Sequence, residues 1–226
     1  MTTQTAAKPV SANRTMSLTD RAYRELEERI VTLDLAPGSV LSEAQLSEQL
    51  NIGRTPIREA LQRLAREGLI VILPRKGILV SDINPSKQLL VLEVRREIER
   101  MMARAGAERR SEDERQAFLE IAAGMEQAAR DNDDIAFLRF DTDFNVLLAQ
   151  ASHNEYAVGA IDLLNGLSRR FWYLHYKKAA DMPLMARLHA SVAKAIADGN
   201  ADAAAAASDA LVDYVEAFTR ATVGGA

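Results

Sequence analysis

The sequence contains no cysteine among its 226 residues, which excludes disulfide bonds and thiolate chemistry. It also contains no uninterrupted apolar run of about eighteen residues and no charged-then-apolar leader. We therefore expect neither a membrane span nor a secretory signal. Hydrophobic residues make up 48% of the chain and charged residues 27%, which indicates a globular protein that we expect in the cytoplasm.

Charge is distributed unevenly along the chain, whose net charge is −4. Residues 1–81 carry 11 basic and 9 acidic side chains, whereas the remainder carries 17 and 23. Within residues 54–76, six basic residues accompany only two acidic ones. A local basic patch on an acidic protein is typical of a DNA-contacting module joined to a domain with another task.

Residues 15–81 show the pattern of a winged helix-turn-helix domain. Apolar residues recur at helical spacing from Ser17 until the Pro37-Gly38 pair ends the pattern. Ser42, followed three residues later by a glutamine, predicts a capping box at the start of a second helix. A third helix is expected over about 54–67, and two β-branched runs around a basic turn then predict a hairpin.

The rest of the chain predicts a second, entirely helical domain. Residues 1–14 are polar and aperiodic, so we expect a disordered arm there, and residues 82–87 are expected to form a linker. Residues 88–222 are expected to form a six-helix antiparallel bundle, which makes the fold mostly α. The expected helices lie near 86–109, 112–130, 134–151, 154–176, 183–198 and 201–222, the second of them with a capping box at Ser111 and Glu114.

The third helix has one apolar and one polar face at helical spacing. Arginine can bind guanine, and glutamine adenine, through two hydrogen bonds each, while threonine and helix N-terminal amides bind phosphate. Such charges often form only a solvated helix face, but the preceding helix, the turn and the basic hairpin favour DNA binding. We therefore predict DNA contacts from the polar face and the helix start: Arg54, Thr55, Arg58 and Gln62.

The motifs of this region resemble the signature of GntR-family regulators over about residues 30–81. The segments that carry the resemblance are Pro37-Gly38-Ser39-Val40-Leu41-Ser42-Glu43, Arg54-Thr55-Pro56-Ile57-Arg58-Glu59-Ala60-Leu61, Glu67-Gly68-Leu69 and Pro74-Arg75-Lys76-Gly77. The resemblance implies that Arg54, Thr55 and Arg58 contact DNA. It also implies that the wing with Arg75, Lys76 and Gly77 enters the minor groove.

Two positions depart from the common form of this signature. Asn51 stands where glycine is usual, and Gly53 stands where serine is usual. Glycine is acceptable at a helix N-cap, but a hydroxyl contact to phosphate would be lost. We expect weaker DNA binding with an unchanged mode of recognition.

The second domain resembles the FCD effector domain over roughly residues 88–222. The segments that carry this looser resemblance are Glu93-Val94-Arg95-Arg96 with Glu99, Asp141-Thr142-Asp143-Phe144-Asn145, and Ala151-Ser152-His153-Asn154. Members of that family commonly hold a divalent metal with an aspartate, a histidine four residues later and two further histidines. The resemblance places Asp141, Asn145, His189 and Tyr214 at these positions.

The side chains at these four positions differ from the usual ligand set. Zn²⁺ and Ni²⁺ prefer imidazoles, and an amide oxygen or a phenol is a much poorer ligand. The tentative metal set Asp141, Asn145 and His189 therefore predicts a weak or absent divalent site. A hydrogen-bonded cluster with water, a weakened site completed by water or effector, and an unrelated surface arrangement remain open.

An anionic effector would need a cationic anchor in this domain. Arg95 belongs to the Glu-x-Arg motif, and Arg169 lies beside an aromatic segment on an expected helix. Salt bridges from these arginines to nearby glutamates (Glu93, Glu97 or Glu99) are the alternative. Together with the polar positions above, the arginines predict a pocket for a small carboxylate, lined by Arg95, Asp141, Asn145, Arg169, His189 and Tyr214.

These patterns predict a transcription repressor rather than an enzyme. We expect a homodimer on an inverted-repeat operator, released by a small organic acid. Activation, or sensing of an acyl-CoA or a sugar acid, remains open within the same family. A helical metalloenzyme is disfavoured because no nucleophile–base pair is recognisable, and an architectural DNA binder because the second domain is acidic.

Overall fold

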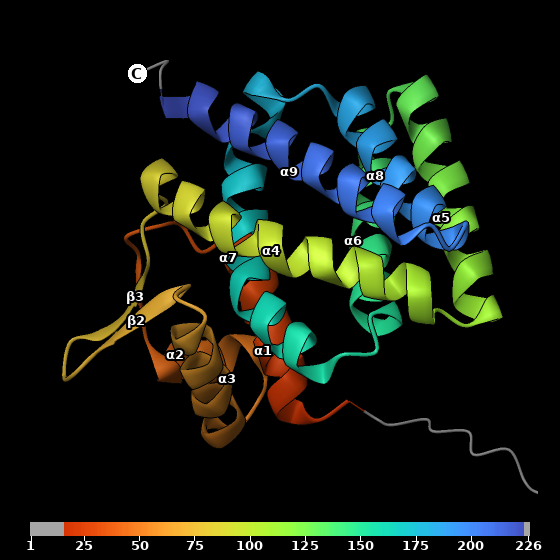
Figure 1. The fold of residues 1–226 in the computed structure, drawn as a ribbon. Helices are drawn as coiled ribbons and strands as arrows, with labels where there is room; N and C mark the ends of the chain where they lie inside the picture. Colours follow the sequence, from red (N-terminus) through yellow and green to blue (C-terminus); the bar gives the residue numbers. More distant parts are fainter. Residues whose placement is uncertain (1–15, 224–226) are drawn as a thin grey trace, which may run out of the picture.

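The computed structural model describes residues 16–223, apart from the side chains of Lys178, Ala179 and Val223, and is mostly helical (Figure 1). The arm expected at residues 1–14 lies outside the described residues. Two separate clusters of buried apolar residues form the cores of an N-terminal and a C-terminal domain, which confirms the expected fold class. No helix among the described residues is long and apolar enough to cross a membrane.

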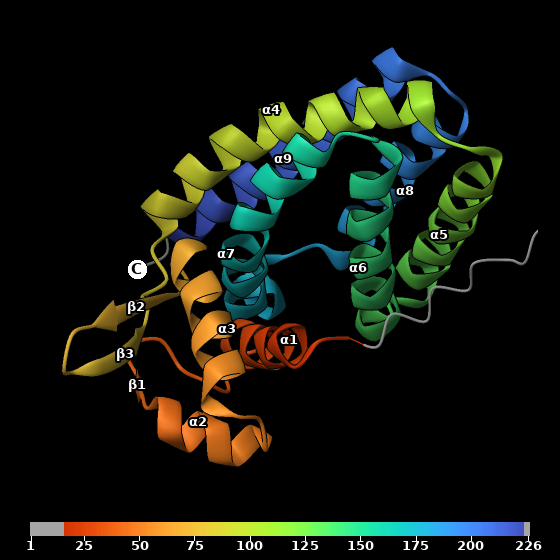
Figure 2. The same cartoon turned by 90° about the horizontal axis from the view of Figure 1, so that it is seen from below.

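The N-terminal domain combines three helices with a three-stranded antiparallel sheet of order β1-β3-β2. The short strand β1 was not expected, because two residues carry no recognisable pattern. The β2–β3 hairpin projects away from the rest of the molecule (Figures 1 and 2). The elements are α1 (Leu18–Val31), β1 (Val40–Leu41), α2 (Glu43–Leu50), α3 (Arg54–Arg66), β2 (Ile70–Leu73) and β3 (Gly77–Val80).

Local signals set the ends of these helices, with one exception. The Ser17 hydroxyl accepts a hydrogen bond from the Asp20 amide and begins α1, and Gly68, at φ +75°, follows the end of α3. The capping box expected at Ser42 is not formed, because its side chain makes no cap hydrogen bond. The extended backbone of Ser42 and the acidic Glu43 in the first turn begin α2 instead.

The C-terminal domain consists of six helices within the described part of the chain. Asn84 caps α4 through the Lys87 amide, and Pro85 occupies the first turn, where no N–H is needed. The connection between the domains is therefore shorter than the expected linker 82–87. The capping box at Ser111 is confirmed. The helices are α4 (Pro85–Arg109), α5 (Glu112–Asp131), α6 (Asp134–Ala151), α7 (Glu155–Ala179), α8 (Met182–Ala197) and α9 (Ala201–Val223).

Helix α7 occupies a special place in this bundle. Helices α4 and α9 run antiparallel along one side, and α5 packs against α8 (Figure 1). Helix α7 packs on α4 and α9 but also reaches α1 of the DNA-binding domain (Figure 2). Its Leu167 packs against the N-terminal core. Helix α7 thus belongs to the bundle and forms its contact with the other domain.

Candidate DNA-binding surface and effector cavity

The apolar face of α3 fixes which of its side chains remain outside. Ile57, Leu61 and Leu64 are buried in the N-terminal core. At 100° per residue, the intervening positions then point away from that core. The four residues expected to contact DNA, Arg54, Thr55, Arg58 and Gln62, are all exposed and lie on one helix.

The structure adds a residue that the sequence did not indicate. Glu43 of α2 accepts hydrogen bonds from Arg58, with Nη2–Oε2 at 2.8 Å and Nε–Oε1 at 3.2 Å. The hydrogen bond from Arg58 also holds the pKa of the Glu43 carboxyl below its usual value. The two-point contact orients the Arg58 guanidinium before DNA arrives. The acidic residue opening α2 of the motif was the available signal.

The wing carries two exposed basic residues, Arg75 and Lys76, at the tip of the hairpin. Gly77 follows with φ +102°, and a Cβ there would lie 3.1 Å from the Leu41 carbonyl oxygen. The close approach of β1 therefore requires glycine at this position. The expected contact of Gly77 with DNA stays a prediction, while its packing role is clear.

The two departures from the common signature both lie at helix ends. Asn51 ends α2 in the left-handed conformation, with φ 50° and ψ 45°. Asparagine tolerates this conformation better than most residues, which explains how it can replace glycine. Gly53 is the N-cap of α3 and provides no capping side chain.

A cavity of about 650 Å³ lies in the C-terminal bundle and extends to the DNA-binding domain. Cavities of this size hold small organic ligands. The wall contributed by the bundle includes the aromatic residues Phe137, Phe144, Phe171 and Trp172. The wall contributed by the DNA-binding domain consists of Tyr23, Arg24, Glu27 and Glu28 of α1 and Arg63 of α3.

Three of the expected effector residues meet in this cavity. His189 Nε2 lies 2.9 Å from Asp141 Oδ1, and the Asn145 amide donates to the same oxygen at 3.2 Å. His189 Nδ1 lies 2.9 Å from the Met185 carbonyl oxygen. A protonated imidazole satisfies both contacts, because it donates from each ring nitrogen.

The ionisation of this pair follows from its surroundings. Burial raises the pKa of Asp141, but the hydrogen bond and charge of His189, with the charges of Arg95 and Arg169, outweigh burial and hold it below its usual value. Burial lowers the pKa of His189, but the hydrogen bond and charge of Asp141 outweigh burial and raise it. Both directions favour the ion pair of a carboxylate and an imidazolium over the neutral pair.

Both expected arginines line the cavity, but they have different partners. Arg95 Nε donates to Glu99 Oε1 at 2.6 Å on the same helix, as the salt-bridge alternative expected. Arg169 Nη1 instead donates to Glu27 Oε1 of α1 at 2.8 Å, and Nη2 lies 3.4 Å from Glu28 Oε2. The second arginine therefore pairs with the DNA-binding domain, which no local pattern predicted.

Tyr214 does not join the other expected effector residues. Its hydroxyl accepts a hydrogen bond from the Asp181 amide at 2.7 Å and donates to the Asp181 carbonyl oxygen at 3.3 Å. It does not line the cavity, to which α9 contributes Ser208, Leu211, Val212 and Val215 instead. The rotation of α9 about its axis decided this, and the assignment of Tyr214 from the resemblance placed the wrong face inward.

The side chains in the cavity do not fit the divalent metal that the FCD resemblance implies. Asp141 and His189 contact each other directly, and Asn145 turns its NH₂ group toward the carboxylate. Helix α9 contributes Ser208, Leu211, Val212 and Val215 to the wall, and none of these side chains is an imidazole or a carboxylate. Within residues 16–223, no three His, Cys, Asp or Glu side chains are grouped to hold a metal ion. We therefore derive no step through a metal.

Comparison with protein families agrees with this two-domain organisation. Residues 18–80 match the model described as bacterial regulatory proteins of the gntR family. Residues 90–214, more than half of the chain, match the FCD domain. The two matches meet at the connection between β3 and α4.

Individual relatives extend over both domains. The chain is 29% identical over 195 residues to the HTH-type transcriptional repressor RspR of Escherichia coli, covering 84% of each chain. It is 26% identical over 180 residues to the Nta operon transcriptional regulator of Aminobacter aminovorans, covering 78% of this chain and 82% of the relative.

Solved structures share the fold. The structure of E. coli McbR/YncC superposes with a TM-score of 0.79 over 92% of this chain and all of that chain, at 18% identity. A putative GntR regulator from Rhodococcus sp. RHA1 superposes with a TM-score of 0.65 over 93% of this chain and all of that one, at 19% identity. The chain belongs to the GntR family of DNA-binding transcriptional regulators, in the group that carries an FCD domain, and is not an enzyme.

Proposed function

We propose that this regulator is a cytoplasmic repressor that binds an inverted-repeat operator as a homodimer and is released when a small carboxylate enters the cavity. The observation that carries the proposal is the 650 Å³ cavity with Arg95, Arg169 and the Asp141–His189 pair on its wall. Guanidinium and imidazolium groups are the donors that bind carboxylates best. The relative RspR is a transcriptional repressor, which supports repression as the direction of regulation.

The DNA part of the proposal rests on the exposed face of α3. A duplex selected from a randomised pool by the full chain should contain an inverted repeat, because a two-fold dimer presents two equivalent helices. Arg58→Ala should lose about 1–3 kcal/mol of discrimination between this duplex and a scrambled one. Arg66→Ala, an exposed arginine outside the expected contact set, is the matched control.

Fluorescence anisotropy at physiological salt measures both variants. If Arg58→Ala binds the selected duplex with wild-type affinity, α3 does not read the operator. Equal losses for the two arginines would show only a general charge effect, since phosphate contacts carry no sequence information.

The effector part is tested with acetate, benzoate, succinate and citrate as probes. At least one acid should weaken operator binding, and Arg95→Gln should abolish the response without changing DNA binding by the free protein. Strengthened operator binding would indicate an acid-dependent corepressor or activator instead. No response to any acid, with a response to an acyl-CoA, would overturn the carboxylate assignment.

The side chains on the cavity wall also predict how much metal the purified protein contains. We expect substoichiometric Zn²⁺ and Ni²⁺ after ordinary purification, because only Asp141 and His189 are strong ligands. Elemental analysis of the purified chain measures this. One tightly held zinc ion per subunit would contradict the proposal.

A further inference from the structure

The contact between the two domains shares its central residue with the cavity. Arg169 lines the cavity and lies near enough to Asp141 to lower the pKa of that carboxyl. The same guanidinium binds Glu27 and Glu28 of α1. We call Arg169, Glu27 and Glu28 the interdomain latch. Its arginine belongs to the bundle and its two carboxylates belong to the DNA-binding domain.

The next residue along α7 fixes the connection between the domains. Arg170 is 2% exposed and donates to the carbonyl oxygens of Ser81 at 2.8 Å and Asp82 at 3.2 Å. Arg170 does not line the cavity, so an anion bound there does not compete for it. Opening the latch would leave this anchor and the apolar contact of Leu167 in place, which favours a small rotation of the DNA-binding domain about residues 81–84.

We propose that an anionic ligand in the cavity competes with Glu27 and Glu28 for Arg169, so that ligand binding opens the interdomain latch and reorients the DNA-binding domain. The proposal rests on the carboxylate effector proposed above and assigns residues of α1 to the regulation of that site. The ligand that this proposal requires is a small carboxylate whose two oxygen atoms point toward α7.

The charges around the cavity explain why Arg169 rather than Arg95 is the shared group. Arg95 is 16% exposed and pairs with Glu99 on its own helix, so its partner stays in place whichever way the domains move. The Arg169 side chain is 40% exposed, and its partners lie on another domain. A carboxylate that binds Arg169 replaces the charge of Glu27 and leaves no arginine unpaired. The displaced carboxylates of Glu27 and Glu28 lose this partner and gain water when α1 moves away, which couples ligand binding to the movement of α1.

Competition makes a prediction that a purely structural salt bridge does not. Glu27→Gln removes the carboxylate closest to Arg169 and should tighten binding of the best of acetate, benzoate, succinate and citrate by about fivefold, the upper range for a partly exposed pair. Asp162→Asn is the matched control, because Asp162 also lines the cavity but its charge acts on Arg63. It should tighten binding less than twofold. Trp172, the only tryptophan, lines the cavity and reports binding by its fluorescence.

A second measurement tests the latch without any ligand. Because the chain has no cysteine, spin labels can be attached at Glu48→Cys in α2 and Glu120→Cys in α5, both exposed positions. The labelled chain is diluted with unlabelled chain, and the distance distribution is measured by pulsed electron resonance. Glu27→Gln combined with Glu28→Gln should broaden or shift this distribution. Glu25→Gln, at an exposed position of the same helix that does not line the cavity, should leave it unchanged.

The outcomes separate the two proposals. If the wild type binds none of the four acids, the carboxylate effector fails, and the distance measurement still decides the latch. If an acid binds with equal affinity to the wild type and to Glu27→Gln, competition is wrong although the effector assignment stands. An unchanged distance distribution in the double variant, or equal tightening by Asp162→Asn, would also overturn the latch.

Discussion

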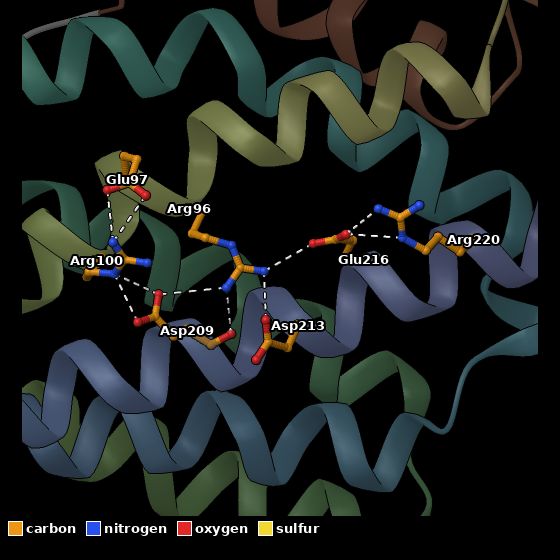
Figure 3. A network of polar contacts seen from close by, with 7 residues as sticks. All are labelled: Arg96, Glu97, Arg100, Asp209, Asp213, Glu216 and Arg220. Carbon is orange, nitrogen blue, oxygen red and sulfur yellow. Dashed lines mark hydrogen bonds and ion pairs between the residues drawn. The ribbon is translucent and has the colours of Figure 1, made fainter.

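The C-terminal bundle makes two contacts through charged side chains, one between its helices α4 and α9 and one between α7 and α1 of the DNA-binding domain. The first contact contains many more charged side chains than the second. Between α4 and α9, Arg96 reaches three acidic residues of α9, and Arg100 joins the same network (Figure 3). Between α7 and α1, Arg169 forms ion pairs with Glu27 and Glu28 of the DNA-binding domain. The members of the first network are Arg96, Glu97, Arg100, Asp209, Asp213, Glu216 and Arg220.

This difference shows which contact can open. In the α4–α9 network Arg96 and Arg100 each keep another carboxylate when one is lost, so the loss of one pair does not separate the helices. The latch has one arginine, and both of its partners move together with α1. Exposed ion pairs each contribute little to stability. A contact with several arginines is therefore harder to open than one that depends on a single arginine.

We expect the largest effect on the free energy of unfolding from removing the contact between Arg170 and the segment that connects the domains. Arg170→Met should lower the free energy of unfolding by about 2 kcal/mol, because the backbone carbonyls of Ser81 and Asp82 lose a charged donor. Urea unfolding followed by Trp172 fluorescence measures this. Arg220→Met, at the exposed end of the α4–α9 network, should change stability by less than about 0.5 kcal/mol. Similar values for the two variants would contradict the anchoring role of Arg170.

A smaller effect tests the α4–α9 network. Asp209→Ala removes a carboxylate shared by Arg96 and Arg100 and should cost about 1 kcal/mol, since all three side chains are partly exposed. Asp213→Ala, whose side chain is 68% exposed, should cost less than half as much. Urea unfolding measures both, and 0.5 M NaCl should reduce the difference because salt screens exposed charges. A difference that persists in salt would indicate packing rather than charge.

The latch itself should contribute least to stability. Glu27→Gln should change the free energy of unfolding by less than about 0.5 kcal/mol, because the Arg169 side chain is exposed enough for water to screen the pair. The same variant should nevertheless change carboxylate affinity, as argued above. A stability loss as large as that of Arg170→Met would show that the α1–α7 contact is not reversible.

The pair inside the cavity adds a pH dependence to this comparison. Because the pKa of His189 is raised in the folded protein, protonated His189 stabilises the fold fully at pH values below the pKa of histidine in the unfolded chain. This stabilisation is lost as the pH rises through the pKa of the folded state. The lowered pKa of Asp141 means that its contribution is lost only as the pH falls below its usual range. The melting temperature should therefore fall as the pH rises above about 6.5, the ordinary pKa of histidine. In Asp141→Asn this fall should be smaller, and an unchanged fall would contradict the pairing.

The sequence alone determined the helices and the outward face of α3. Caps such as Ser111 act on amides three residues away, and apolar periodicity repeats within one turn, so both are visible in a short window. The ends of α5 and α6 and the exposure of Arg54 and Arg58 followed from these signals. The strand β1 escaped because two residues form a strand only when β3 lies beside them.

Tertiary structure alone decided which side chains meet in the cavity and between the domains. Arg169 and Glu27 are separated by 142 residues, and no local preference brings them to 2.8 Å. The choice between Tyr214 and Leu211 on the cavity wall depends on the rotation of α9, which packing against α4 and α8 sets. Caps and periodicity act within a turn, whereas a shared site depends on how whole helices dock.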